Sequence, residues 1–269
     1  MLPVLVRLLP RWLPAPALVS GEDLAEQPRS RALYLDEAAR RHADTALKVL
    51  QQELGHLAAN SRQVIASALY LPPEFRQDMT RERALSEPLP VPPLAEREDA
   101  DALYHQHIKG IYADIVDFLS HLDCDPLPEQ QQALMQLNLA ARDLVEAVKA
   151  AKHLQSNLRK HIDSQRPALR EGYRQLREQG RLLLSDQARR DADGLSVTVE
   201  QQRSDAYVDQ QQLFRSQFEQ RLNQQLRAGE LDGWQATSLL NDLHYLLESS
   251  ANLRAAHDAL AIPSDLAEA

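Results

Sequence analysis

Residues 47–71 read LKVLQQELGHLAANSRQVIASALYL, and their apolar positions recur at alternating steps of three and four. The recurring positions are Leu47, Leu50, Leu54, Leu57, Ser61, Val64, Ala68 and Leu71. Because an α-helix turns once every ~3.6 residues, this spacing places these side chains on one face. The stretch therefore predicts a helix over 36–71 with a single buried stripe.

The same spacing continues along the chain and predicts five further helices. Their expected ranges are 96–123, 128–162, 167–192, 197–227 and 234–261. The helix over 167–192 has the weakest pattern, because Gly172 and Gly180 interrupt it and each glycine costs up to ~1 kcal/mol relative to Ala. The stripes are too narrow for burial on all sides. We therefore expect an all-α fold, an antiparallel bundle with shallow crossing angles.

Prolines divide the chain between these helices. The stretch 72–93 is rich in proline and lacks apolar periodicity, so we expect an exposed, semi-extended connector there. The helix order suggests two halves of three helices each. The expected divisions are a tail and linker at 1–30, a first half at 31–162, a second half at 163–262 and a short tail at 263–269.

The composition of the 269 residues excludes several classes of protein. A net charge of −9 repels a phosphate backbone, so we expect no nucleic-acid partner. A single cysteine, Cys124, excludes an internal disulfide and fits a reducing compartment. No segment holds the ~18 uninterrupted apolar residues that span a bilayer. Glycine-rich nucleotide-binding motifs do not occur, and no cofactor is expected.

The first 19 residues, MLPVLVRLLPRWLPAPALV, are apolar but do not fit a secretion signal, because Arg7 and Arg11 fall inside the apolar run. Four prolines would also break a spanning helix. The pattern favours an interfacial segment whose arginines face lipid headgroups. The residues expected to contact a membrane or a partner are Leu5, Leu8, Trp12 and Leu13.

Seven short segments resemble the PhoU-like cytoplasmic domain of bacterial sodium/phosphate cotransporters. They are 31–36 (RALYLD), 46–47 (AL), 53–58 (ELGHLA), 65–69 (IASAL), 108–112 (IKGIY), 140–144 (AARDL) and 239–243 (LLNDL). The resemblance covers about residues 1–262 and lacks the membrane portion of that family. It implies two three-helix repeats in a cytoplasmic bundle that accompanies and regulates phosphate uptake.

PhoU proteins can seat metal clusters on acidic residues four positions apart, which share a helix face. In this sequence Lys149 stands where an acid is expected in the stretch that begins at Asp143, and Leu246 lies four residues after Asp242. A cluster of that kind is therefore not expected. Asp114, Asp117 and His121 are the remaining candidate metal ligands on one helix face, and their spacing equally fits a water-facing surface.

A few polar residues fall on otherwise apolar stripes or beside charges. Ser61, Ser250 and His257 lie on apolar stripes, where a buried polar group needs a hydrogen bond, so we interpret them as core register residues. Cys124 lies between Asp123 and Asp125, whose charges raise a thiol pKa, so we do not expect a reactive nucleophile.

These patterns lead to one main hypothesis and two alternatives. The main one is a non-enzymatic PhoU-like domain at the cytoplasmic face of the inner membrane, where it modulates a sodium-coupled phosphate transporter through protein contacts. One alternative is a free-standing cytoplasmic PhoU-type regulator. The other is a metal-dependent enzyme that uses Asp114, Asp117 and His121. The Gln-rich segments 130–132 and 210–212 fit either solvent or a second subunit, so a homodimer stays open.

Overall fold

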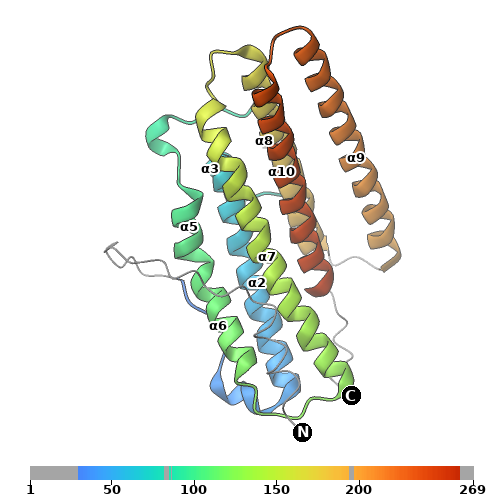
Figure 1. The fold of residues 1–269 in the computed structure, drawn as a ribbon. Helices are drawn as coiled ribbons and strands as arrows, with labels where there is room; N and C mark the ends of the chain where they lie inside the picture. Colours follow the sequence, from blue (N-terminus) through green and yellow to red (C-terminus); the bar gives the residue numbers. More distant parts are fainter. Residues whose placement is uncertain (1–29, 82–84, 86, 194–196, 261–269) are drawn as a thin grey trace.

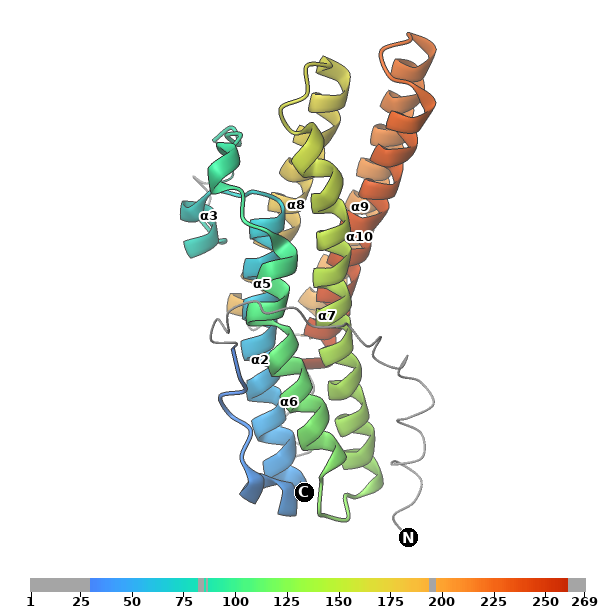
Figure 2. The same cartoon turned by 60° about the vertical axis from the view of Figure 1, so that its left-hand side comes forward.

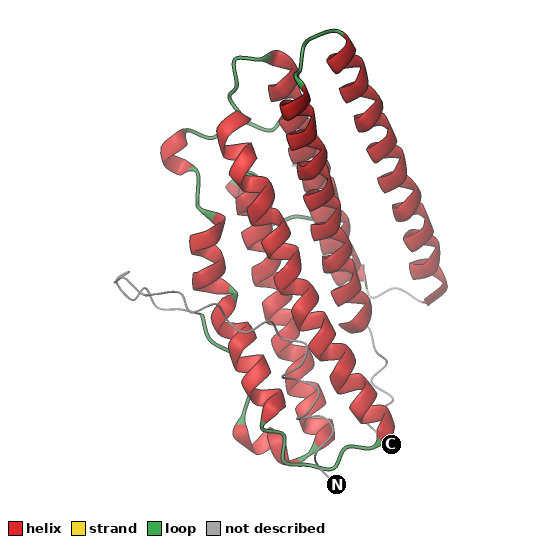
Figure 3. Ribbon diagram, viewed as in Figure 1, coloured by secondary structure: helices red, strands yellow, loops and turns green. Residues whose placement is uncertain are grey.

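The computed structural model describes residues 30–81, 85, 87–193 and 197–260. Within these ranges the regular elements are all helices, without strands (Figure 3). The all-α prediction is therefore confirmed. Successive long helices run in opposite directions and lie side by side along one axis (Figures 1 and 2).

The elements in chain order are η1 (Glu37–Arg41), α2 (Ala43–Ala68), α3 (Pro73–Gln77), η2 (Leu94–Glu96), α5 (Ala100–His107), α6 (Lys109–Ser120), α7 (Pro128–His161), α8 (Pro167–Asp193), α9 (Val197–Arg227) and α10 (Gly233–Leu260). The last four begin and end within one residue of their expected ranges. Periodicity was sufficient there, because a proline or glycine lies at or near the boundaries of these helices, and the interrupting glycines of α8 do not end it.

The first helix is shorter than the expected range 36–71. Asp36 caps the separate 3-10 turn η1 by accepting a hydrogen bond from Ala38 N at 2.9 Å, and α2 begins only at residue 43. At its other end Tyr70 adopts a left-handed φ of 52°. Leu71 N then bonds back to Ala66 O at 3.0 Å, which closes the helix before the prolines.

The second expected helix, 96–123, is two helices separated at Ile108. In a continuous helix the carbonyl of Gln106 would accept a hydrogen bond from the amide of residue 110. Here that carbonyl accepts instead from Ser30 N at 2.8 Å. The break therefore marks the place where the N-terminal segment meets the bundle, which periodicity within one helix does not encode.

The expectation for the connector over 72–93 is wrong in part. Its residues 73–77 form α3, with Pro73 at the first helical position. Phe75, Met79 and Leu89 are buried and belong to the main hydrophobic core. Phe75 and Met79 are four residues apart, but α3 ends at Gln77 and Leu89 lies outside any helix. The three side chains therefore form no helical stripe that periodicity could have revealed.

The core lies between α2, α7, α8 and α10. The most extensive contact joins α7 to α10, followed by that between α2 and α7, and α9 packs mainly on α10. The predicted stripes are buried as expected, including Leu50, Leu54 and Leu57 of α2. Burial of these stripes is the main source of stability, at ~25 cal/mol per Å² of apolar surface.

The two glycines of α8 lie where this helix approaches its neighbours most closely. A Cβ at Gly180 would lie 2.4 Å from Leu69 Cδ1, and one at Gly172 would lie 2.9 Å from Leu239 Cδ2. Both leucines are fully buried. The residues that weaken the helical pattern of α8 therefore allow it to pack tightly against α2 and α10.

Candidate functional site

Residues 30–36, called the strap below, are held against the bundle by a buried carboxylate. Glu53 of α2 is 0% exposed, and its Oε2 accepts hydrogen bonds from Leu33 N at 2.7 Å and Tyr34 N at 2.8 Å. The other oxygen, Oε1, lies 2.8 Å from His56 Nδ1. These donors satisfy a charge whose burial would otherwise be costly. Glu53 also lies three residues after Leu50, a spacing that signals its inward face.

Asp114 of α6 holds the other side of the strap. Its Oδ2 accepts from Ala32 N at 2.9 Å, and its Oδ1 lies 2.8 Å from Arg31 Nη2. Ser30 N completes the attachment at the α5–α6 break. Asp114 was a candidate metal ligand, but its oxygens face the strap and the guanidinium of Arg31.

The other two candidate metal ligands lie at the end of α6. Asp117 Oδ2 accepts from Arg40 Nη2 at 2.8 Å, and Asp117 Oδ1 lies 3.3 Å from His121 Nδ1. Both side chains are more than half exposed. The structure therefore does not bring Asp114, Asp117 and His121 together as a ligand set. Across the described residues, no group of three or more His, Cys, Asp or Glu side chains is placed to hold a metal ion.

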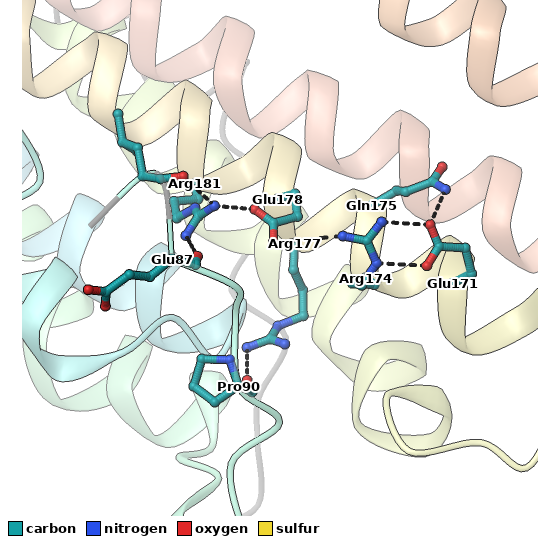
Figure 4. A network of polar contacts seen from close by, with 9 residues as sticks. Glu87, Pro90, Glu171, Arg174, Gln175, Arg177, Glu178 and Arg181 are labelled. Carbon is teal, nitrogen blue, oxygen red and sulfur yellow. Dashed lines mark hydrogen bonds and ion pairs between the residues drawn. The ribbon is translucent and has the colours of Figure 1, made fainter. Parts of the chain in front are cut away.

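A buried arginine of α8 joins three segments of the chain (Figure 4). Arg177 is 1% exposed, and its guanidinium donates to Leu69 O at 2.9 Å, Tyr70 O at 2.5 Å and Pro90 O at 2.9 Å. Burial lowers the pKa of Arg177 to about 10, so the group stays charged at neutral pH. Its positive charge therefore faces the C-terminal carbonyls of α2, where cations are favourable.

Two further arginines hold the connector in place. Arg181, one turn beyond Arg177, donates to Glu87 O at 2.6 Å and Leu85 O at 2.8 Å and also pairs with Glu178 (Figure 4). Arg97 donates to Pro92 O at 3.1 Å and pairs with Asp163 at 2.9 Å. Sequence reasoning missed these arginines, although Arg177 lies four residues after a stripe position of α8.

Asp242 is the most strongly perturbed carboxyl group in the core. Its Oδ2 accepts from Tyr173 Oη at 2.7 Å and its Oδ1 from Asn157 Nδ2 at 3.3 Å, so it joins α7, α8 and α10. Burial raises the pKa of Asp242 to about 6, although both hydrogen bonds and nearby Lys160 lower it. The ring of His161 stacks on Tyr173 at a centroid distance of 5.5 Å, and burial lowers the pKa of His161.

The remaining predicted residues have mixed outcomes. Ser250 Oγ hydrogen-bonds Tyr207 Oη, as a core register residue should. Ser61 is fully buried, but its Oγ has no partner in the described part of the chain, so the expected hydrogen bond is absent there. His257 is half-buried on α10. Burial, and then the charges of the neighbouring Asp123 and Asp125, raise the pKa of the Cys124 thiol, in the expected direction.

Leu5, Leu8, Trp12 and Leu13, which the sequence predicts to contact a membrane or a partner, lie outside the described residues. Among the helices the structure describes, none combines the length and apolar character needed to cross a membrane. No protein-family model, no curated protein and no solved structure matches the chain.

Five of the polar groups described above, unlike Asp242 and Ser250, bond to the main chain of another segment. Glu53 and Asp114 accept from backbone amides, and Arg97, Arg177 and Arg181 donate to backbone carbonyls. Such groups fix segments that do not carry a helical stripe, because each unpaired backbone group would cost about 1–3 kcal/mol when buried. The chemistry of this site is therefore that of holding the strap and connector in defined positions.

Proposed function

We propose that the chain is a non-catalytic, PhoU-like regulatory domain that works by protein contact at the cytoplasmic face of a membrane. In this proposal it accompanies sodium-dependent phosphate transport. The repeats are 31–162, with α2, α5–α6 and α7, and 163–262, with α8, α9 and α10. The third helix of each half, α7 or α10, takes part in the most extensive helix–helix contact within the described residues, so in this proposal the two halves pack against each other there.

The observation that carries the proposal is the way the resembling segments contact one another. Segment 31–36 is bound by Glu53 of segment 53–58, through hydrogen bonds to Leu33 N and Tyr34 N. It is also bound by Asp114, two residues after segment 108–112. Segments of this chain that individually resemble the PhoU-like domain thus contact one another in the fold. These contacts support the proposal that the resemblance extends to a whole domain.

A transport measurement tests the proposal. The gene is deleted in its native cell, and sodium-dependent uptake of labelled phosphate is measured in phosphate-poor and phosphate-rich medium. We expect the deletion to change the dependence of uptake on phosphate supply, and the wild-type chain to restore it. Unchanged uptake in both media would overturn the proposal.

A matched pair of variants separates regulation from folding. Leu8→Asp with Trp12→Asp changes the tail outside the described bundle, and Glu74→Gln with Glu96→Gln changes exposed charges elsewhere. We expect the tail variant to fail in restoring regulated uptake and the control variant to restore it, at equal protein levels. Restoration by both would exclude the tail as the contact segment.

A further inference from the structure

One end of the bundle differs from the rest in charge and in apolar exposure. The end of α7, the start of α8, the end of α9 and the start of α10 all lie there, at the top of Figure 1, and the view in Figure 2 agrees. Exposed side chains at this end include Asp163, Arg166, Glu230 and Asp232. The exposed residues Arg159, Lys160, Arg170, Arg227 and Trp234 of the same end are called the cationic end below.

Trp234 protrudes from this end on a turn that is held by hydrogen bonds. Its side chain is 88% exposed, the highest value among the exposed large apolar residues of the described chain. The turn that carries it is held by Asp232 Oδ1, which accepts from Gln235 N at 2.9 Å. Arg166 Nη1, from the start of α8, donates to Gln235 Oε1 at 2.8 Å. Trp234 is therefore presented by a turn with its own polar contacts.

The acids at this end are largely neutralised within the fold. Asp163 pairs with Arg97 at 2.9 Å, and Asp232 pairs with Arg166 at 3.3 Å. Glu171 is bound by Arg174, whose hydrogen bond is the main cause that lowers the pKa of Glu171 to about 2. Each of these three carboxylates is therefore paired with an arginine.

The cations of the cationic end lack such compensation. Arg159, Lys160, Arg170 and Arg227 form no ion pair within the ranges that the structure describes, and exposed Glu230 offsets one of their charges. The opposite end of the bundle, at the α6–α7 loop, exposes Asp123, Asp125 and Glu129. Although the net charge of the chain is −9, exposed positive charge is concentrated at one end of the bundle.

We propose that the cationic end docks on an anionic lipid surface, with Trp234 in the headgroup region. Tryptophan favours the membrane–water interface, and each Lys or Arg near an anionic surface strengthens binding about fivefold. The same surface repels the acidic α6–α7 loop, so the bundle binds with its cationic end toward the membrane and the α6–α7 loop away from it. Trp234 protrudes instead of lining a recess, which suits a fluid interface better than a folded acidic peptide.

This inference rests on the proposed function only in placing the chain at a membrane. It adds a docking end within the bundle, separate from the N-terminal tail. Vesicles of pure lipid contain no transporter, so their binding is measured independently of phosphate uptake. A failure to bind vesicles would overturn the docking inference and leave the phosphate-uptake result unaffected. Unchanged phosphate uptake would overturn the proposed function and leave the vesicle result unaffected.

The test uses the full chain with Trp12→Phe, which leaves Trp234 as the only tryptophan. Its fluorescence is recorded with phosphatidylcholine vesicles and with vesicles that contain about 30% phosphatidylglycerol. We expect a blue shift of Trp234 emission and co-sedimentation only with the anionic vesicles, both reversed by high salt. Binding to vesicles without a shift of Trp234 emission would assign the contact to the tail and overturn the proposal.

Two charge variants of equal net change distinguish a local contact from overall charge. Lys160→Gln, Arg170→Gln and Arg227→Gln together should weaken vesicle binding about 100-fold, at about fivefold per cation. The control combines Arg41→Gln, Lys48→Gln and Lys109→Gln, three exposed cations away from this end, and should bind as the parent does. Equal weakening by both sets would overturn the proposal. So would a Trp234 shift with polyglutamate in place of vesicles.

Discussion

Replacing Asp242 by Asn should raise the free energy of unfolding at about pH 8, because it removes a buried negative charge. The side chain is 0% exposed, and burial raises its pKa from 3.8 to about 6. A shift of about two units corresponds to about 3 kcal/mol, at about 1.4 kcal/mol per unit. An amide is less well matched to the two donors Tyr173 and Asn157. We therefore expect a gain of about 1–3 kcal/mol.

The gain should depend on pH in a defined direction. As pH falls through about 6, folded Asp242 takes up a proton, whereas the unfolded chain does so only near its ordinary pKa of 3.8. Protonation therefore stabilises the folded wild-type protein between these two values. The advantage of Asp242→Asn should shrink by about 3 kcal/mol over this interval, which leaves no advantage or a small loss near pH 4. His161 acts in the opposite direction, because its folded pKa is lowered, and the comparison of variant with wild type cancels its contribution.

Urea unfolding followed by far-ultraviolet circular dichroism measures both free energies across this pH range. Tyr173→Phe serves as a second arm, because it removes a donor that lowers the pKa of Asp242. It should move the titration to higher pH. A constant difference between Asp242→Asn and wild type at all pH values would refute the reasoning, as would a loss of more than about 1 kcal/mol at pH 8.

Four further variants test the packing and the buried polar contacts. Gly180→Ala should lower the free energy of unfolding by about 1–2 kcal/mol, measured by thermal or urea unfolding, because the new Cβ meets Leu69, whereas Gly55→Ala, in open space, should raise it by about 0.5–1 kcal/mol. Equal effects at both glycines would contradict the close approach of Gly180 to Leu69. Arg177→Met should lower the free energy of unfolding by about 2–4 kcal/mol, because three buried carbonyls lose their hydrogen-bond donor. An unchanged free energy of unfolding would show that water replaces the guanidinium as the donor. Glu53→Gln should speed hydrogen exchange at the strap amides by about tenfold or more, with α7 as the unchanged internal reference. Unaltered exchange at the strap would show that the hydrogen bonds from Glu53 do not hold it in place.

The sequence by itself determined the all-helical class, the boundaries of α7 to α10 and the inward stripes. These features are local, because a 3.6-residue period and a bounding proline or glycine can be read within one segment. It also placed Ser250 in the core. Periodicity alone overran α2 at both ends, because the Asp36 cap and the Leu71–Ala66 hydrogen bond are local features that an apolar stripe does not show. It also missed the break at Ile108, because that break depends on a hydrogen bond from Ser30, which is distant in the chain.

Only the tertiary structure decided what the buried polar residues hold. Asp114 has the spacing of a metal ligand, yet its oxygens face Arg31 and the strap. Arg177 lies beside a helical stripe as an ordinary charged residue, and its burial follows from α2 ending against α8. A polar side chain carries the same pattern in the sequence whether it meets water or a backbone carbonyl. Its role is therefore fixed by the long-range packing that brings the two segments together.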